Sequence, residues 1–297
     1  MKRLLFVLLA LTTMPAAAAL KVFATVPEWG ALAREIGGDQ VQVFVATTAL
    51  QDPHRIDARP SLIARARSAD LLLATGAELE IGWLPVVQRE SGNARIQSGQ
   101  PGYFEAARHV AMLEIPPRLD RADGDVHAGG NPHVQTDPRN FLRIGEALAA
   151  RMAQLDPPNA GAYRAGFAAS AERLRGNIAR WEKQAAPLKG IAVMSQHKGW
   201  AYLYDWLGLR EVGTLEPVPG VEPTAAHVAR LRDQAATTRP RMVIRAAYNA
   251  GRPAEWFAAE TRVPVVVLPF TVGGSERAGD IAGLFDDTVE RLLKAVQ

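Results

Sequence analysis

The chain has 297 residues, of which 48% are hydrophobic, and it carries a formal net charge of +3. This length suggests one large domain or two of ordinary size, and the apolar content excludes a disordered chain. The positive charge comes mostly from scattered arginines rather than from a basic stripe with interleaved aromatic residues. We therefore expect no nucleic-acid partner.

Residues 1–19 have the order of a secretory signal peptide. Two basic residues are followed by a short apolar run and then by small residues, with an Ala-x-Ala signal-peptidase site that ends at Ala19. The apolar run is too short for a permanent membrane-spanning helix. We expect an exported chain whose mature part begins near Leu20, and an ordinary buried N-terminal helix is the alternative.

The sequence contains no cysteine. We therefore expect no disulfide bond, and a metal site would have to be built from His, Asp and Glu. Without a lipobox cysteine, the exported product is predicted to be soluble in the periplasm rather than lipid-anchored. After residue 19 no stretch is apolar enough over sufficient length to insert stably in a membrane.

Strand and helix patterns alternate along residues 20–157, which is typical of an α/β lobe. Strands are predicted at 21–25, 41–47 and 70–76, and helices are predicted just before Gly37, at 61–69 and at 139–153. The continuous apolar run DLLLATG at 70–76 suits a strand that is buried on both faces of a parallel sheet.

Residues 158–189 change the pattern and predict one long helix. Apolar residues recur there at helical spacing, with no proline between Tyr163 and Ala186. A helix of about 25 residues is near 37 Å long and could join two lobes as a rigid spine. The strand and helix alternation restarts over residues 190–297. We therefore expect two α/β lobes with parallel-type sheets flanked by helices.

Three of the six histidines lie in loops that lead into predicted helices. His54 and His197 follow predicted strands, where ligands bind in open α/β sheets, and His133 lies in a Gly/Pro loop. Pro53 and Pro132 restrict the backbone just before two of them, which limits the entropy lost when a metal orders the site. Each histidine alone could be structural, whereas the three together favour a site for a borderline metal.

The other three histidines carry weaker signals. His109 and His227 are expected to be exposed. His127 lies in the acidic stretch DRADGDVHAGG, which needs no function if it is a solvated loop. Together, however, Asp123, Asp125 and His127 could hold a metal ion loosely.

Five segments, in order along essentially the whole mature chain, resemble the periplasmic substrate-binding components of zinc and manganese ABC importers, the cluster A-I family. They are LQDPHRIDARPS, ADLLLATGAELEIGWL, NPHVQTDPRN, SQHKGWAYLYDWLGL and VEPTAAHVARL. The resemblance implies two α/β lobes bridged by one long helix, with the metal in the cleft between them. It also implies that His54, His133 and His197 are ligands and that 120–130 is a short form of the family's His- and Asp-rich loop.

Two positions depart from the family's pattern. Gln135 stands where an aromatic residue usually follows the second ligand. The family's fourth ligand is an Asp after the last strand, and here that place falls on Pro269 or Phe270, neither of which can bind a metal. The fourth position is then taken by water or by another carboxylate, with Glu222 and Glu216 as candidates; Glu222 also fits a family position that has no ligand role.

These observations lead to a binding protein rather than an enzyme. The leading hypothesis is a monomer that captures Zn²⁺ in the periplasm and meets an ABC permease and its ATPase transiently. Three neutral imidazoles favour zinc over manganese, because carboxylate oxygen suits Mn²⁺ better. A carrier of Mn²⁺, of another divalent metal or of a chelated metal is the alternative within the family.

A zinc-dependent hydrolase is the alternative outside the family. Three histidines and a water can form a catalytic zinc site. Against this reading, the sequence has no HExxH motif and no obvious general base beside a ligand. Burial discriminates the two, since a carrier encloses its ion whereas a hydrolase needs a groove for its substrate.

Overall fold

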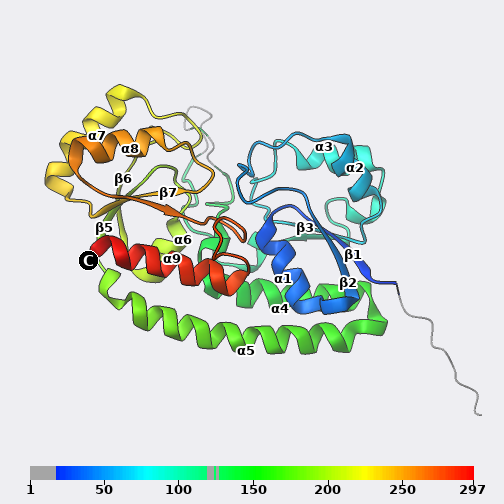
Figure 1. Cartoon of the computed structure of the whole chain (residues 1–297). Coiled ribbons are helices and arrows are strands. Elements are labelled where there is room, and N and C mark those ends of the chain that lie inside the picture. The colour runs from blue at the N-terminus through cyan, green and yellow to red at the C-terminus, as the bar shows by residue number, and fades with distance from the viewer. Residues whose placement is uncertain (1–17, 119–123, 125–126) are drawn as a thin grey trace, which may run out of the picture.

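The computed structural model describes residues 18–118, 124 and 127–297, which form two α/β lobes above one long helix (Figure 1). The N-terminal lobe contains the strands β1 (Leu20–Ala24), β2 (Val41–Val45), β3 (Leu71–Ala74) and β4 (Tyr103–Glu105). They form a parallel sheet in the order β2-β1-β3-β4. The order reverses beside β1, so the loops after the strands open a crevice at their carboxyl ends.

Helices cover both faces of this sheet because its strands are apolar on both sides. The helices are α1 (Pro27–Gly37), α2 (Pro60–Arg67), α3 (Leu84–Ser91) and α4 (Pro138–Leu155). Val22 and Leu71 face the core that contains α1 and α4, whereas Phe23 and Leu72 face α2 and α3. This alternation follows from the two-residue period of a strand.

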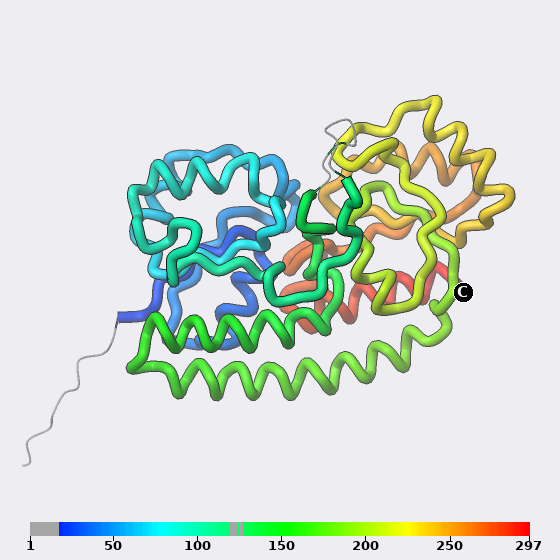
Figure 2. The backbone as a smooth tube through the Cα atoms, turned by 180° about the vertical axis from the view of Figure 1, so that it is seen from behind, coloured from blue at the N-terminus to red at the C-terminus, as the bar shows by residue number. Residues whose placement is uncertain are grey.

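The helix α5 (Ala160–Ala185) has 26 residues and runs beneath both lobes, as both views show (Figures 1 and 2). Its length is about 39 Å at 1.5 Å per residue. Short 3₁₀ turns over Pro157–Asn159 and Ala186–Leu188 flank it. The sequence-based prediction of two lobes joined by one long helix is confirmed.

The C-terminal lobe repeats the same architecture. Its strands are β5 (Ala192–Ser195), β6 (Arg210–Thr214), β7 (Met242–Ala246) and β8 (Val265–Leu268), and its helices are α6 (Ala201–Leu207), α7 (Ala225–Thr238), α8 (Arg252–Thr261) and α9 (Ile281–Val296). The strands are parallel in the order β6-β5-β7-β8. The sequence patterns did not indicate α3, β4 and α8, which are short elements.

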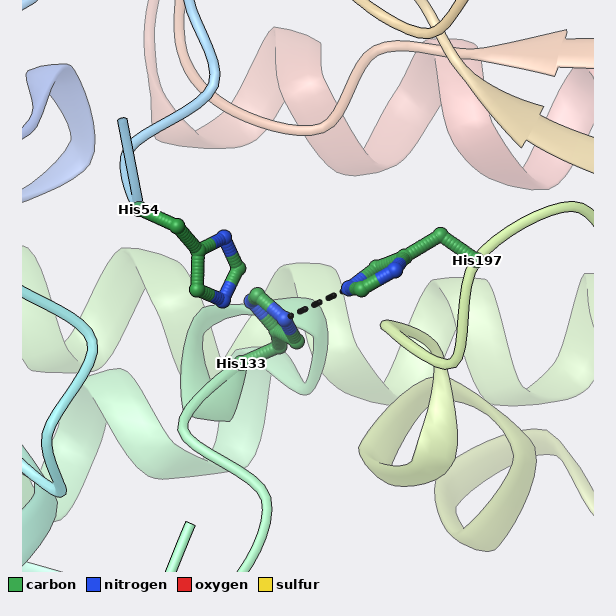
Figure 3. A group of neighbouring side chains, drawn as sticks. All are labelled: His54, His133 and His197. Atoms are coloured by element: carbon green, nitrogen blue, oxygen red, sulfur yellow. Dashed lines mark hydrogen bonds between the residues drawn. The ribbon is translucent and has the colours of Figure 1, made fainter. Parts of the chain in front are cut away.

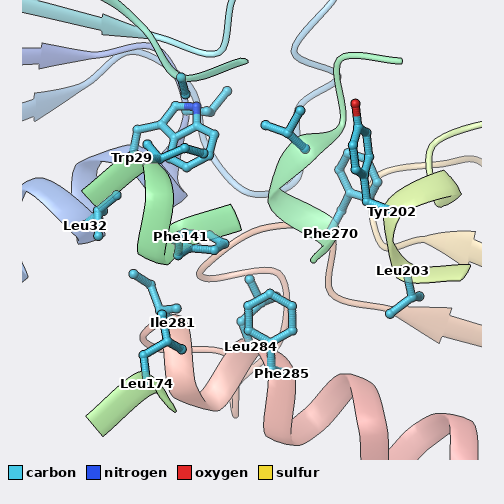
Figure 4. Packing of buried hydrophobic residues seen from close by; sticks show 14 of the residues in the cluster. Trp29, Leu32, Phe141, Leu174, Tyr202, Leu203, Phe270, Ile281, Leu284 and Phe285 are labelled. Carbon is cyan, nitrogen blue, oxygen red and sulfur yellow. The ribbon is translucent and has the colours of Figure 1, made fainter. Parts of the chain in front are cut away.

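One hydrophobic core passes through both lobes (Figure 4). Trp29 of α1 packs on Phe141 of α4 with ring centroids 5.4 Å apart, and Phe141 packs on Phe285 of α9 at 5.9 Å. Phe285 in turn contacts Trp181 of α5 at 5.3 Å. Because these rings interdigitate across the base of the lobes, the lobes are held in a defined relative position.

Within the described residues, no helix combines the length and the apolar character that crossing a bilayer requires.

Candidate metal centre

His54, His133 and His197 converge from three separate loops between the two lobes (Figure 3). One ring nitrogen of each lies within 4.8 Å of those of the other two. The ring centroids are 5.2 to 5.7 Å apart. Among the described residues, these three form the one group of His, Asp and Glu side chains that could hold a metal ion.

His54 lies in the loop between β2 and α2, and its neighbours fix both its backbone and its ring. Asp52 Oδ1 accepts hydrogen bonds from the His54 backbone N–H at 3.0 Å and from Nδ1 at 2.8 Å. The carbonyl of Pro53 accepts a bond of 3.0 Å from the indole of buried Trp83. Burial tends to raise the pKa of Asp52, but the hydrogen bonds from His54 outweigh it and lower that pKa. The carboxylate is therefore an anionic acceptor for the ring.

His133 lies in a tight turn just before α4. Its backbone N–H donates to Asn131 Oδ1 at 3.0 Å, and its carbonyl accepts from the Thr136 hydroxyl at 3.0 Å. Asn131 Nδ2 also donates to the carbonyl of Lys198 at 2.9 Å, which joins this loop to the loop that carries His197. Burial, followed by the charges of the neighbouring histidines, lowers the pKa of His133 well below its usual range. Its imidazole is therefore neutral at pH 7, as a metal ligand must be.

His197 follows β5 by two residues and is 7% exposed. Its Nδ1 lies 2.7 Å from Oε2 of Glu216. The backbone N–H of Glu216 donates to the carbonyl of Gln196 at 3.0 Å, so the chain after β6 runs beside the chain after β5. The carboxylate is thus placed on the ring by the sheet itself.

One pair of ring nitrogens has the spacing of two ligands in a tetrahedral zinc site. Nε2 of His133 and Nε2 of His197 lie 3.3 Å apart. Two nitrogens bound to one tetrahedral zinc at about 2.0–2.1 Å are separated by about 3.3 Å. A carboxylate on Nδ1 selects the tautomer that carries hydrogen there, which leaves Nε2 of His54 and His197 as an acceptor toward a metal. Nε2 of His54 is buried without a hydrogen-bond partner.

Phe270 closes one side of the three-histidine group. Its ring lies 5.1 Å from that of His133 and also packs on Trp200 and Tyr248 at 4.9 and 5.5 Å. Of the two residues that stand in place of the family's Asp, Phe270 has an aromatic ring that contacts His133. Burial, followed by the charges of Asp52 and Glu216, raises the pKa of Tyr248 well above its usual range, so its phenol is neutral.

The two carboxylates considered as a fourth ligand have different surroundings. Glu216 lies on Nδ1 of His197, the ring nitrogen that does not approach His133. Glu222 is exposed in the loop between β6 and α7. In the described part of the chain, neither belongs to the metal-capable group.

The acidic stretch is described only in part. Asp123 and Asp125 lie outside the described residues, so their predicted role is a proposal. His127 is described, and its ring stacks on that of His54 with centroids 5.5 Å apart. Of the remaining histidines, His109 is exposed as expected. The expectation for His227 was wrong: it is half-buried, because its Nε2 lies 3.0 Å from the carbonyl of Thr214.

A cavity of about 760 Å³ adjoins the histidines. His127, His133 and His197 line it, together with the proline-containing segments 115–118 and 217–219. Its carboxylates are engaged: Glu114 contacts Lys198 at 3.1 Å, and Glu211 accepts a hydrogen bond from the Ser195 hydroxyl. The cavity gives the buried imidazoles a route to solvent.

Sequence reasoning missed Asp52 as a site residue, although it stands only two positions before His54. An acidic residue at that spacing can cap the ring nitrogen of the histidine, so a local signal existed. The role of Glu216 had no such signal, because it lies 19 residues beyond His197 and reaches it only through the pairing of β5 with β6.

Known proteins resemble this chain over most of its length. The profile of the family described as zinc-uptake complex component A, periplasmic, matches residues 22–295. The chain belongs to this family. A high-affinity zinc uptake system protein ZnuA of Paracoccus denitrificans is 25% identical over 249 residues, which cover 73% of this chain and 72% of the relative. The manganese ABC transporter substrate-binding lipoprotein PsaA of Streptococcus pneumoniae is 22% identical over 260 residues, covering 85% and 80%.

Solved structures share the fold of this member of the family. A crystal structure of ZnuA aligns with a TM-score of 0.78 at 23% identity, over 94% of this chain and all of that one. A Cd-bound periplasmic metal binding protein from Candidatus Liberibacter asiaticus aligns with a TM-score of 0.77 at 17% identity, also over 94% and 100%. The chain is therefore a metal ABC transporter substrate-binding protein by family, and its relatives are named for zinc as well as for manganese.

Proposed function

We propose that this chain captures Zn²⁺ in the periplasm and delivers it to the permease and ATPase of an ABC importer. The observation that carries the proposal is the Nε2–Nε2 separation of 3.3 Å between His133 and His197, which matches one edge of a tetrahedral zinc site. His54 completes a set of three imidazole ligands, and water occupies the fourth position. The carboxylates of Asp52 and Glu216 orient two of the rings.

Zinc is favoured over manganese by the chemistry of the donors. The group found among the described residues contains three nitrogens and no carboxylate oxygen. Imidazole suits zinc, whereas Mn²⁺ prefers oxygen. Phe270 supplies an apolar wall where a carboxylate would have added a hard donor. Manganese carriage is the second candidate, because one of the relatives is named for that metal.

The placement of the acids supports binding rather than catalysis. A hydrolase requires a general base that can reach a metal-bound water. The carboxylates of Asp52 and Glu216 are engaged by Nδ1 of His54 and Nδ1 of His197, respectively. Glu114 and Glu211, which line the adjoining cavity, hold Lys198 and Ser195. We therefore assign the cavity to the entry and exit of the metal rather than to a substrate.

The remaining parts of the proposal concern location and capture. Residues 1–19 act as a signal peptide, the mature chain is a soluble monomer of the periplasm, and 20–157 and 190–297 are its two lobes, joined by 158–189. Asp123, Asp125 and His127 provide an auxiliary capture site. The stacking of His127 on His54 supports this role, because it places that imidazole at the edge of the main site.

Metal analysis of native protein tests the proposal. The chain is exported in its host, purified without added metal and without chelator, and measured by mass spectrometry for all divalent metals. We expect about one zinc per chain, with manganese well below that level. Stoichiometric manganese would transfer the assignment to the second candidate, and a metal-free chain that also fails to take up either ion would reject the carrier role.

A further inference from the structure

Arg55, the residue after His54, connects the two lobes. Its Nη2 donates a hydrogen bond of 2.7 Å to the carbonyl of Gly220, which lies 165 residues further along the chain. Arg55 belongs to the loop between β2 and α2, and Gly220 belongs to the loop between β6 and α7. A contact between these loops therefore links the loop that carries His54, called the His54 arm below, with the C-terminal lobe. The loop after β5 that carries His197 is called the His197 arm.

The backbone N–H of Gly220 connects to a second histidine. This N–H donates to Glu216 Oε2 at 2.9 Å, and the same oxygen contacts Nδ1 of His197 at 2.7 Å. Gly220 has a φ of +77°, a left-handed conformation that favours glycine. The loop thus folds back on the carboxylate that holds His197 and presents its carbonyl to Arg55.

Glu216 is a firm anchor for this loop. The backbone N–H groups of Leu215 and Glu216 donate to the carbonyls of Ser195 and Gln196 at 2.8 and 3.0 Å. These bonds continue the pairing of β6 with β5 up to the residue before His197. Movement of Gly220 relative to His197 is therefore restricted, and Arg55 contacts a point that is fixed with respect to that ligand.

His133 and His197 are joined independently of Arg55. Asn131 Nδ2 donates to the carbonyl of Lys198 at 2.9 Å, and the hydroxyl of Tyr202 donates to the carbonyl of Asn131 at 2.8 Å. The loops that carry His133 and His197 are therefore hydrogen-bonded to each other without any contribution from Arg55. The loop that carries His54 is the third part of the site. Its separation from the loops of His133 and His197 would open the metal site.

On the basis of the proposed function, we propose that Arg55 is a positioning residue for cargo retention. The bridge formed by Arg55, Gly220 and Glu216 ties the His54 arm to the His197 arm and slows the loss of bound Zn²⁺. Before the metal can leave, the His54 arm must withdraw, and the hydrogen bond from the guanidinium opposes that withdrawal. The bond has a charged donor, and because Arg55 is exposed, solvent screens part of its strength.

The sign of the effect separates this role from simple electrostatics. Arg55 is a cation beside a cation site, so removing its charge alone should favour bound Zn²⁺ and slow its release. Removing the bridge should instead speed release. A change in the dissociation rate of Arg55→Ala therefore has opposite directions under the two explanations.

Release kinetics of the full-length mature protein test the bridge. Protein loaded with one equivalent of Zn²⁺ is mixed with excess chelator in a stopped-flow instrument, and association is measured separately with free Zn²⁺. We expect Arg55→Ala to dissociate about tenfold faster, with an association rate within about twofold of the original protein. Arg55→Lys, which keeps a donor, should lie between them. Arg59→Ala removes the same charge from another exposed position in the same loop and should release Zn²⁺ at the original rate or more slowly.

A second variant approaches the bridge from its other end. Pro219→Gly loosens the loop before Gly220 without touching Arg55, and it should also speed release. In the double variant Arg55→Ala/Pro219→Gly, the second change should add little, because both act on the contact between Arg55 and Gly220.

Three results would contradict the bridge: fully additive effects of the two changes, an unchanged or slower release of Zn²⁺ by Arg55→Ala, or an effect confined to the association rate. If the original protein fails to hold Zn²⁺ at all, the proposed function fails first, and that outcome is distinct from these.

Discussion

Glu216 holds the ring of His197 by its Nδ1 at 2.7 Å and thereby directs Nε2 toward His133, 3.3 Å away. The relationship joins strand pairing to metal chemistry, because β5 carries the histidine and β6 leads to the carboxylate. Asp52 holds the ring of His54 in the same way, with its Oδ1 2.8 Å from Nδ1 of the histidine. Two of the three imidazoles are therefore oriented before any metal arrives, which lowers the entropic cost of binding.

Removing any one of the three histidines should damage zinc binding. We expect alanine at His54, His133 or His197 to lower zinc affinity at least tenfold, because each supplies one of few ligands. A competition titration against a chromophoric chelator measures this. His109→Ala and His227→Ala are the controls and should retain the original affinity; equal losses in all five variants would show that the ligand assignment is wrong.

Glu216 should act as an acceptor for His197 rather than as a ligand. Glu216→Ala is expected to lower zinc affinity by about 10- to 100-fold, as for other partners of metal-bound histidines. Glu216→Gln should retain most of the affinity, because its amide oxygen can still accept from Nδ1. If Glu216 were instead a direct metal ligand, both variants would lose zinc affinity.

Glu222 is the matched control in the same loop. Because it is exposed, Glu222→Ala should leave zinc affinity within about twofold of the original value in the same titration. If this variant abolishes binding while Glu216→Ala does not, Glu222 is the fourth ligand and the site is not open to water.

An acid in place of Phe270 should change metal preference. The ring of Phe270 lies against His133, so Phe270→Asp is the substitution that brings a carboxylate toward the metal. We expect tighter binding overall and a ratio of manganese to zinc affinity that rises at least tenfold, since a hard oxygen is added. Isothermal titration with each ion measures both affinities.

The buried position of Phe270 requires a packing control. Phe270→Leu loses part of the ring contacts but adds no donor, so its metal preference should be unchanged. Pro269→Asp should also leave that preference unaltered. A shift toward manganese in the leucine variant would attribute the effect to packing rather than to the new ligand.

Glu28 should make stability depend on pH. It is buried in α1 and accepts a hydrogen bond from Thr271 of the other lobe; burial raises its pKa from 4.5 to about 7. Because the folded state keeps this proton longer, the protonated group stabilises the fold fully below pH 4.5, and that contribution is lost as pH rises through about 7. The loss amounts to about 3 kcal/mol.

Urea unfolding of the metal-free protein at pH 5 and pH 8 measures this effect. Glu28→Gln keeps an acceptor for Thr271 but cannot ionise. The difference in unfolding free energy between the original protein and this variant should therefore shift by about 2.5 kcal/mol in favour of the variant between the two pH values. A difference that is the same at both would show that Glu28 does not titrate in this range.

The strand and helix pattern predicted most of the fold because the buried strands are apolar on both faces. DLLLATG indicated β3, and the absence of proline indicated α5. The patterns missed β4, which has three residues, and α3 and α8, which are short helices with a proline in the first turn. A strand of three residues carries too few positions for an alternating pattern to be recognised, whereas α2, which is as short as α3, was predicted.

The site was predictable where its chemistry is local in sequence. His54, His133 and His197 were singled out by their place after strands and in proline-restricted loops. The contact of Arg55 with Gly220 and that of Glu28 with Thr271 span 165 and 243 residues. Such contacts depend on how the two lobes sit on α5, and no periodicity in the sequence encodes that relation.

Zinc K-edge X-ray absorption of the loaded protein tests the central claim most directly, because it counts imidazoles around the metal. We expect a shell of four light-atom ligands at about 2.0–2.1 Å, with outer-shell scattering from three imidazoles. His133→Ala should reduce that scattering to two imidazoles. Outer-shell scattering from fewer than three imidazoles in the original protein, unchanged by His133→Ala, would contradict the three-histidine centre.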